Sequence, residues 1–116
     1  MADYRMIKKA LIGAGIQTYA PGEKNGICTA PYAVIREAGT YPFAVHKNGY
    51  TLWVVHLYVP MSKYRELAPL QERVKTVLRG FSELKETGNV SPDIIEEKYQ
   101  AHTRSMEYQL LRTFTK

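Results

Sequence analysis

The feature that most constrains this chain is a strand-like run, residues 50–59, with apolar side chains on both faces. Successive side chains of a strand point to opposite faces. One face receives Trp53, Val55, Leu57 and Val59, and the other receives Tyr50, Leu52, Val54, His56 and Tyr58. An antiparallel strand with one side in water usually carries polar side chains there. We therefore expect both faces of this strand to be covered.

A hairpin is predicted around this run. Asn48-Gly49 supplies the two residues of a type I′ turn, which would join strands at residues 41–47 and 50–59. This turn places Lys47 opposite Tyr50, His46 opposite Thr51 and Tyr41 opposite His56. Before it, residues 32–37 read as a short strand that ends in a turn at Gly39.

Three helices and a last strand complete the prediction. A helix capped by Asp3 is expected over residues 4–19, with an apolar face that includes Ile7 and Leu11. A second helix is expected over residues 63–81, with Ser62 as N-cap and a kink or fresh start at Pro69. Ser91-Pro92-Asp93 is typical of the start of a short third helix. The alternation of residues 106–110 predicts a strand that runs to about Phe114.

The predicted fold class is α+β, with a mainly antiparallel four-stranded sheet and two long helices and one short helix packed on it. The 116 residues fit one domain, residues 1–116. Two helices can cover one face of such a sheet, and a neighbouring subunit would then cover the other. In the alternative, the N-terminal helix crosses to the second face.

Composition argues against several functions. The net charge is +5, but positive and negative side chains are interleaved, as on a solvated surface. Nucleic-acid binding stays open on this charge alone. No apolar run is long enough to span a bilayer, and no signal peptide is visible. We therefore expect no membrane partner and a protein made in a cytoplasm.

No motif for catalysis, a metal or a cofactor is visible. The candidates for a soft metal site are Cys28, His46, His56 and His102, and they lack metal-ligand spacing. Residues 10–16 begin like a dinucleotide fingerprint, but Thr18 stands where its third glycine would be. Small residues in a helix explain this segment better. We expect neither an enzyme nor a cofactor, although a site of dispersed residues stays open.

Several segments resemble small tail proteins of bacteriophages and prophages. They are Ala30-Pro-Tyr-Ala-Val-Ile-Arg-Glu37, Val55-His-Leu-Tyr-Val-Pro60, Tyr64-x-x-Leu67 and Ser105-Met-Glu-Tyr108. In element order the chain is most similar to the tail-terminator, or tail-completion, family of the neck between tail and head. The resemblance implies a homo-oligomer, commonly a hexameric ring, that caps the tail tube and joins it to the head.

The implied partners are tail-tube and head-connector proteins, with DNA passing through the ring without specific binding. The implied locations are the host bacterial cytoplasm during assembly and then the virion tail or neck. A head-side connector or stopper protein, and a small basic nucleic-acid-binding module, stay open as alternatives. The expected subunit contact uses Tyr50, His56 and Tyr58 on one face of the sheet, with Tyr41 beside them.

Overall fold

The computed structural model describes residues 3–42 and 48–113 of the chain. Its elements in chain order are α1 (Tyr4–Gly13), β1 (Thr18–Tyr19), β2 (Tyr32–Pro42), β3 (Asn48–Pro60), a 3₁₀ helix (Met61–Glu66), α2 (Leu67–Leu78), β4 (Leu84–Val90), β5 (Ile94–Glu96) and β6 (Ala101–Thr113). The strands form one sheet in the order β1-β2-β3-β6-β4, and β5 pairs with β6. β1 runs parallel to β2, and the other described pairs are antiparallel.

The protein is α+β, but the predicted four-stranded, mainly antiparallel sheet with two long helices and one short helix is wrong. The sheet has six strands and is mixed, and the described residues form two α-helices. Three strands were missed: β5, where we expected a helix, and also β1 and β4. β1 has two residues, and β4 has mostly exposed side chains without apolar alternation. Neither segment carries the period-2 signal on which strand prediction rests.

The predicted third helix is instead the segment that leads into β5. The Ser91 N–H donates to the Ser105 carbonyl over 2.8 Å, and the Ser105 N–H donates to Ser91 Oγ over 2.9 Å. The Asp93 carboxylate accepts from Arg104 Nε over 2.7 Å and from the Tyr64 hydroxyl. These bonds, from Arg104 first, lower the pKa of Asp93. Pairing with β6 satisfies the polar groups that we expected to cap a helix.

The first helix begins as predicted and ends earlier. The Asp3 carboxylate accepts from the Met6 N–H over 3.0 Å, which confirms Asp3 as the N-cap. The helix ends at Gly13 rather than at residue 19. Gly15 follows with a φ of +85°, and the Ile16 N–H bonds to the Leu11 carbonyl in a Schellman motif. The glycines of this segment therefore terminate a helix.

The predicted hairpin turn is wrong. Asn48 and Gly49 lie inside β3, and β2 extends to Pro42, so the strands are longer than expected. In the register, Tyr50 pairs with Tyr41 instead of Lys47, and His46 and Lys47 lie outside the described residues.

The predicted pairing of Tyr41 with His56 is also wrong, because His56 lies opposite Val34. The difference follows from the turn, because Asn48 and Gly49 pair within β3 instead of closing the hairpin. A separate difference is Gly39, which does not end the strand. It adopts a φ of +121° within a β-bulge between Glu37 and Thr40, so β2 continues where we expected a turn.

The second helix has the expected apolar face and a different start. A 3₁₀ helix precedes α2, and Pro60 rather than Ser62 stands at its N-cap position. Pro69 lies in the first turn of α2, so the expected fresh start near this residue is confirmed. Leu70 and Val74 of the expected stripe are buried.

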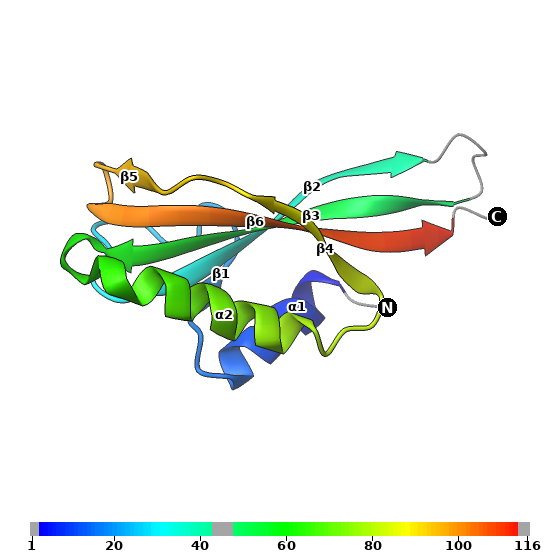
Figure 1. Cartoon of the computed structure of the whole chain (residues 1–116), viewed down its shortest axis with the longest axis horizontal. Helices are drawn as coiled ribbons and strands as arrows, with labels where there is room; N and C mark the ends of the chain where they lie inside the picture. The colour runs from blue at the N-terminus through cyan, green and yellow to red at the C-terminus, as the bar shows by residue number, and fades with distance from the viewer. Residues whose placement is uncertain (1–2, 43–47, 114–116) are drawn as a thin grey trace.

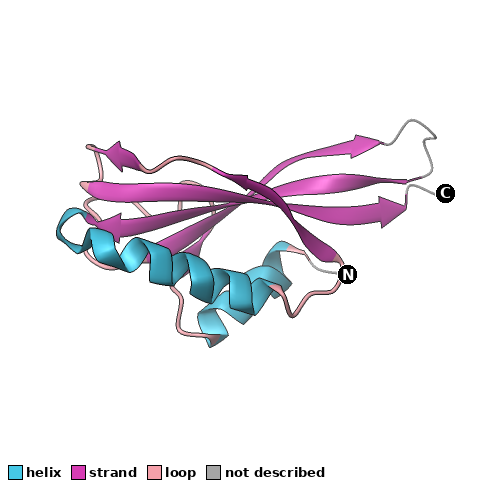
Figure 2. Cartoon of the chain, viewed as in Figure 1, coloured by secondary structure: helices cyan, strands magenta, loops and turns pink. Residues whose placement is uncertain are grey.

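Both helices cover the same face of the sheet, as Figures 1 and 2 show. Their buried side chains pack on those of β2, β3 and β6, including Ile35, Val55, Leu57, Met106 and Tyr108. The carboxylate of Glu86 in β4 lies 3.7 Å from Nζ of Lys75, which is in α2, and 3.5 Å from Nε of Arg79, the C-cap of that helix. These two ion pairs link the edge of the sheet to the helix layer. The alternative in which the first helix crosses to the second face is therefore wrong.

The molecule is elongated, with extents of 49 × 26 × 24 Å. The ends of β2, β3 and β6 near Pro42, Asn48 and Thr113 extend past the two helices (Figure 1). We call this part of the sheet the arm. Neither helix covers the sheet there.

Candidate interaction surface

The sheet face away from the helices is the open face. Strand alternation and the register define it. Its side chains on β2, β3 and β6 are those of Tyr32, Val34, Arg36, Tyr41, Tyr50, Leu52, Val54, His56, Tyr58, Pro60, Ala101, Thr103, Ser105, Glu107, Gln109 and Leu111. All five side chains assigned to the second face of residues 50–59 lie here. The predicted division of that strand between two faces is thus confirmed.

One end of the open face is covered by the chain itself. Cys28 lies in the loop between β1 and β2, and its N–H donates to the Tyr99 carbonyl over 2.8 Å. The rings of Tyr32 and Tyr58 stack with their centroids 4.7 Å apart, and Tyr19 meets Tyr32 edge-on. Burial raises the pKa of both Tyr32 and Tyr58. The predicted contact residue Tyr58 is therefore half-buried within its own chain.

The centre of the open face carries a fixed row of polar side chains from three strands. Arg36 Nε of β2 lies 3.4 Å from His56 Nε2 of β3. The other ring nitrogen, Nδ1, lies 2.7 Å from Ser105 Oγ of β6. A guanidinium can only donate, so Nε2 accepts and Nδ1 carries the proton. Burial, and then the charge of Arg36, lower the pKa of His56.

This arrangement is unsuited to nucleophilic catalysis. A general base must accept the proton of the serine hydroxyl. Here the protonated Nδ1 of His56 donates to Ser105 Oγ, and Arg36 occupies the nitrogen that could accept. The row instead holds three side chains in one orientation and leaves the Ser105 hydroxyl hydrogen available as a donor.

A second polar group lies beside this row. Glu107 Oε1 accepts from Asn89 Nδ2 over 2.9 Å and from Thr87 Oγ1 over 3.2 Å. Asn89 and Thr87 belong to β4, where the register shifts around Gly88, which has a φ of +89°. These bonds fasten the irregular part of β4 to the open face.

The two polar groups border one hollow of about 490 Å³. Arg36, His56 and Ser105 line it from the sheet, and residues 88–91 line it from β4 and the segment that follows. A smaller hollow of about 200 Å³ lies toward Tyr58 and shares Arg36 and His56 with the first. The open face is thus a shallow depression whose floor includes Val54, which is only 6% exposed.

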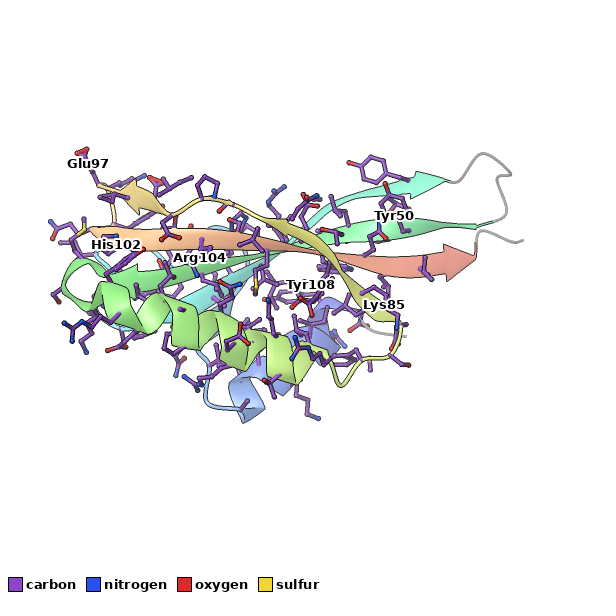
Figure 3. The ribbon with its side chains drawn as sticks, viewed as in Figure 1. Tyr50, Lys85, Glu97, His102, Arg104 and Tyr108 are labelled. Carbon is purple, nitrogen blue, oxygen red and sulfur yellow. The ribbon has the colours of Figure 1, made fainter. Side chains whose placement is uncertain are left out.

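The arm carries the remaining predicted residues. Tyr41 and Tyr50 pair across β2 and β3, with ring centroids 5.4 Å apart. Figure 3 shows Tyr50 on the part of β3 that extends past the helices. Tyr41 is 44% exposed and Leu111 of β6 is 51% exposed. Large apolar side chains are therefore accessible at this end of the sheet.

The structure divides the four predicted contact residues among three places. Tyr58 lies in the covered tyrosine cluster, His56 at the polar centre, and Tyr41 with Tyr50 on the arm. Sequence reasoning missed Arg36, which it placed on a strand without a role. The period-2 alternation of residues 32–37 puts it on one face of its strand with Val34, but only the register with β3 shows that this face also carries His56.

No cluster of His, Cys, Asp or Glu that could hold a metal ion occurs within residues 3–42 and 48–113. Cys28 is buried, its thiol donates to the Ala30 carbonyl over 3.3 Å, and burial raises its pKa. Among the described helices, none is long and apolar enough to cross a membrane. Comparison with known protein families and with curated proteins finds no match to this chain.

Proposed function

We propose that this chain is a structural protein of a phage or prophage tail, of the tail-terminator or tail-completion type. In this proposal, copies assemble into a ring, commonly of six, at the end of the tail tube. The ring stops growth of the tube and presents a surface for joining the head. The chain acts through subunit contacts, without a cofactor and without catalysis.

The observation that carries the proposal is the open face. Its side chains combine half-buried apolar groups such as Leu52 with a fixed polar centre at His56. The arm adds accessible side chains at Tyr41 and Leu111. Large exposed apolar groups that lie together on a small protein favour a protein contact. The fixed orientation of the polar groups lowers the entropy lost when a partner binds.

The shape of the subunit favours a ring. Its open face and its helix layer are different surfaces on opposite sides of the sheet (Figure 2). A contact between two different surfaces is heterologous, and repetition of such a contact closes into a ring when the rotation allows it. The elongated arm extends the reach of each copy beyond its helix layer.

The test is co-expression with the tail-tube protein of the phage or prophage that, under this proposal, encodes this chain, followed by negative-stain microscopy. We expect tubes of limited length with a ring of this protein at one end, and longer, uncapped tubes without it. Tubes of equal length in both samples, with this protein absent from their ends, would contradict the proposal.

A matched pair of variants tests the role of the open face. His56→Asp places a carboxylate between Arg36 and Ser105, both of which can donate to it, so the fold should tolerate the change. The new charge must lose its hydration when a partner covers the face. We expect His56→Asp to abolish capping. Ser82→Asp introduces the same charge at an exposed position of the turn between α2 and β4, outside the open face and both helices, and should leave capping intact.

A further inference from the structure

The open face carries opposite charges in one row across the sheet. Val54 of β3 pairs with Arg36 of β2 on one side and with Glu107 of β6 on the other. The two Cα atoms lie about two strand spacings, or about 10 Å, apart. A positive and a negative side chain thus flank the centre of the face at similar distances.

Both charged groups have capacity for a further partner. Arg36 bonds to His56 through Nε, and within the described residues its two terminal nitrogens have no partner. Glu107 accepts through Oε1, and its Oε2 has no partner in the part of the chain that the structure describes. Arg36 is exposed and Glu107 is half-buried. Each can therefore form a charge-assisted bond with a group that approaches the face.

We infer that the open face binds the open face of a second copy, related by a two-fold axis that runs along β3. Such an axis exchanges the two sides of the sheet, so β2 of each copy lies over β6 of the other. Because Arg36 and Glu107 flank the same residue, each Arg36 then faces the Glu107 of the second copy. Away from the end that the tyrosine cluster covers, two sheets that pack face to face lie about 10 Å apart, which the side chains of Arg36 and Glu107 can span together.

The charges of Arg36 and Glu107 favour a two-fold axis along β3 over one perpendicular to the strands. A two-fold axis perpendicular to the strands would place Arg36 over Arg36 and Glu107 over Glu107, and the like charges would repel. The axis along β3 also brings Leu52 of one copy close to Leu52 of the other. The contact is isologous, so the surface needs to be complementary only to itself.

This pairing goes beyond the proposed ring and does not depend on it. It covers the apolar side chains of the open face in the free protein. Because the proposed ring uses the same face, the pair must separate before the ring closes.

The decisive experiment uses two variants that complement each other. Arg36→Glu alone gives like charges, Glu against Glu, at both contacts, and Glu107→Arg alone gives Arg against Arg. A mixed pair of the two variants has opposite charges at both contacts. We expect the wild type to be a dimer by analytical ultracentrifugation and each variant to dimerise about tenfold or more weakly. The equimolar mixture should restore the dimer, and native mass spectrometry should identify it as a heterodimer.

Leu52 provides a second complementing pair that leaves the hydrogen bonds of the open face unchanged. Leu52→Glu and Leu52→Lys should each be monomeric, and their mixture should dimerise, because the axis places residue 52 beside its own copy. Arg5→Glu, an exposed charge reversal on α1, is the control and should dimerise like the wild type. Circular dichroism of each variant checks that it is folded.

A monomeric wild type at all concentrations, or mixtures that stay monomeric in both complementing pairs, would overturn the two-fold pairing. These outcomes are distinct from those of the tube assay. Capped tubes with monomeric mixtures would leave the proposed function standing without the pairing. A wild-type dimer whose heterodimers form, with no capped tubes, would leave the pairing standing without the proposed function.

Discussion

Tyr108→Phe should stabilise this protein. Tyr108 lies on the helix side of β6 and is 2% exposed (Figure 3). Among the described residues, its hydroxyl has no hydrogen-bond partner, and the same holds for the indole N–H of Trp53, its cross-strand neighbour. Burial raises the pKa of this hydroxyl. The folded state therefore removes a polar group from water without a replacement bond.

The expected gain follows from the desolvation of one hydroxyl. An unpaired buried hydroxyl costs about 1–3 kcal/mol relative to water. Removing one oxygen atom leaves a void smaller than a methyl group, which costs at most about 1 kcal/mol. The net effect of Tyr108→Phe is an increase of about 1 kcal/mol in the free energy of unfolding. For a chain of this size, the midpoint of thermal unfolding should rise by about 4 °C.

Urea unfolding followed by circular dichroism measures this change, with an unchanged m-value as the sign of an unchanged unfolded state. Tyr64→Phe is the matched control, because the Tyr64 hydroxyl donates to Asp93 and its loss should reduce stability. The reasoning is refuted if Tyr108→Phe lowers the free energy of unfolding by about 1 kcal/mol, the effect expected for losing a made hydrogen bond.

Three further predictions concern the fold. Gly39→Ala should lower the free energy of unfolding by about 1–3 kcal/mol, because φ is +121° and the new Cβ would lie 3.0 Å from Tyr41 Oη; an unchanged urea midpoint would argue against this conformation. Leu57→Ala should cost about 2–5 kcal/mol in the same assay, since Leu57 is fully buried, and a loss below about 1 kcal/mol would contradict the described core. Wild-type stability should fall as the pH drops below 6.5, because the pKa of His56 is lowered in the folded state and the unfolded chain binds the proton first. His56→Asn should lose less stability over this pH range, because the contribution of the His56 proton is gone. Identical profiles of stability against pH for the two proteins would rule out a contribution from His56.

Strand alternation in the sequence predicts some features of the open face and not others. The division of residues 50–59 into two faces is correct, because side-chain direction in a strand depends only on position. The uncovered second face was also expected, because two helices can cover only one side of a small sheet. What covers one end of that face was not predictable. The tyrosine cluster depends on where the loop that contains Cys28 returns, and Tyr99, 71 positions later in the chain, provides its partner.

The register errors have a local and a tertiary cause. Asn48-Gly49 is the pair that type I′ turns favour, yet both residues pair within β3. Local preference for a turn is a weak signal when neighbouring strands can add pairs on both sides. Gly39 gave an equally misleading signal, since a positive φ serves a bulge as well as a turn. Ser91 and Asp93 had good helix-start chemistry, but Ser105 and Arg104 of β6 offered the same bonds.

Local chemistry in the sequence determined the cap of the first helix by Asp3, the apolar face of the second helix, and the two apolar faces of the strand around Trp53. These features depend on contacts between residues a few positions apart or on strand geometry alone. Tertiary structure decided the row formed by Arg36, His56 and Ser105, because each residue comes from a different strand. Which strands lie side by side, and in what register, depends on the free energy of the whole sheet, and no short segment carries that information.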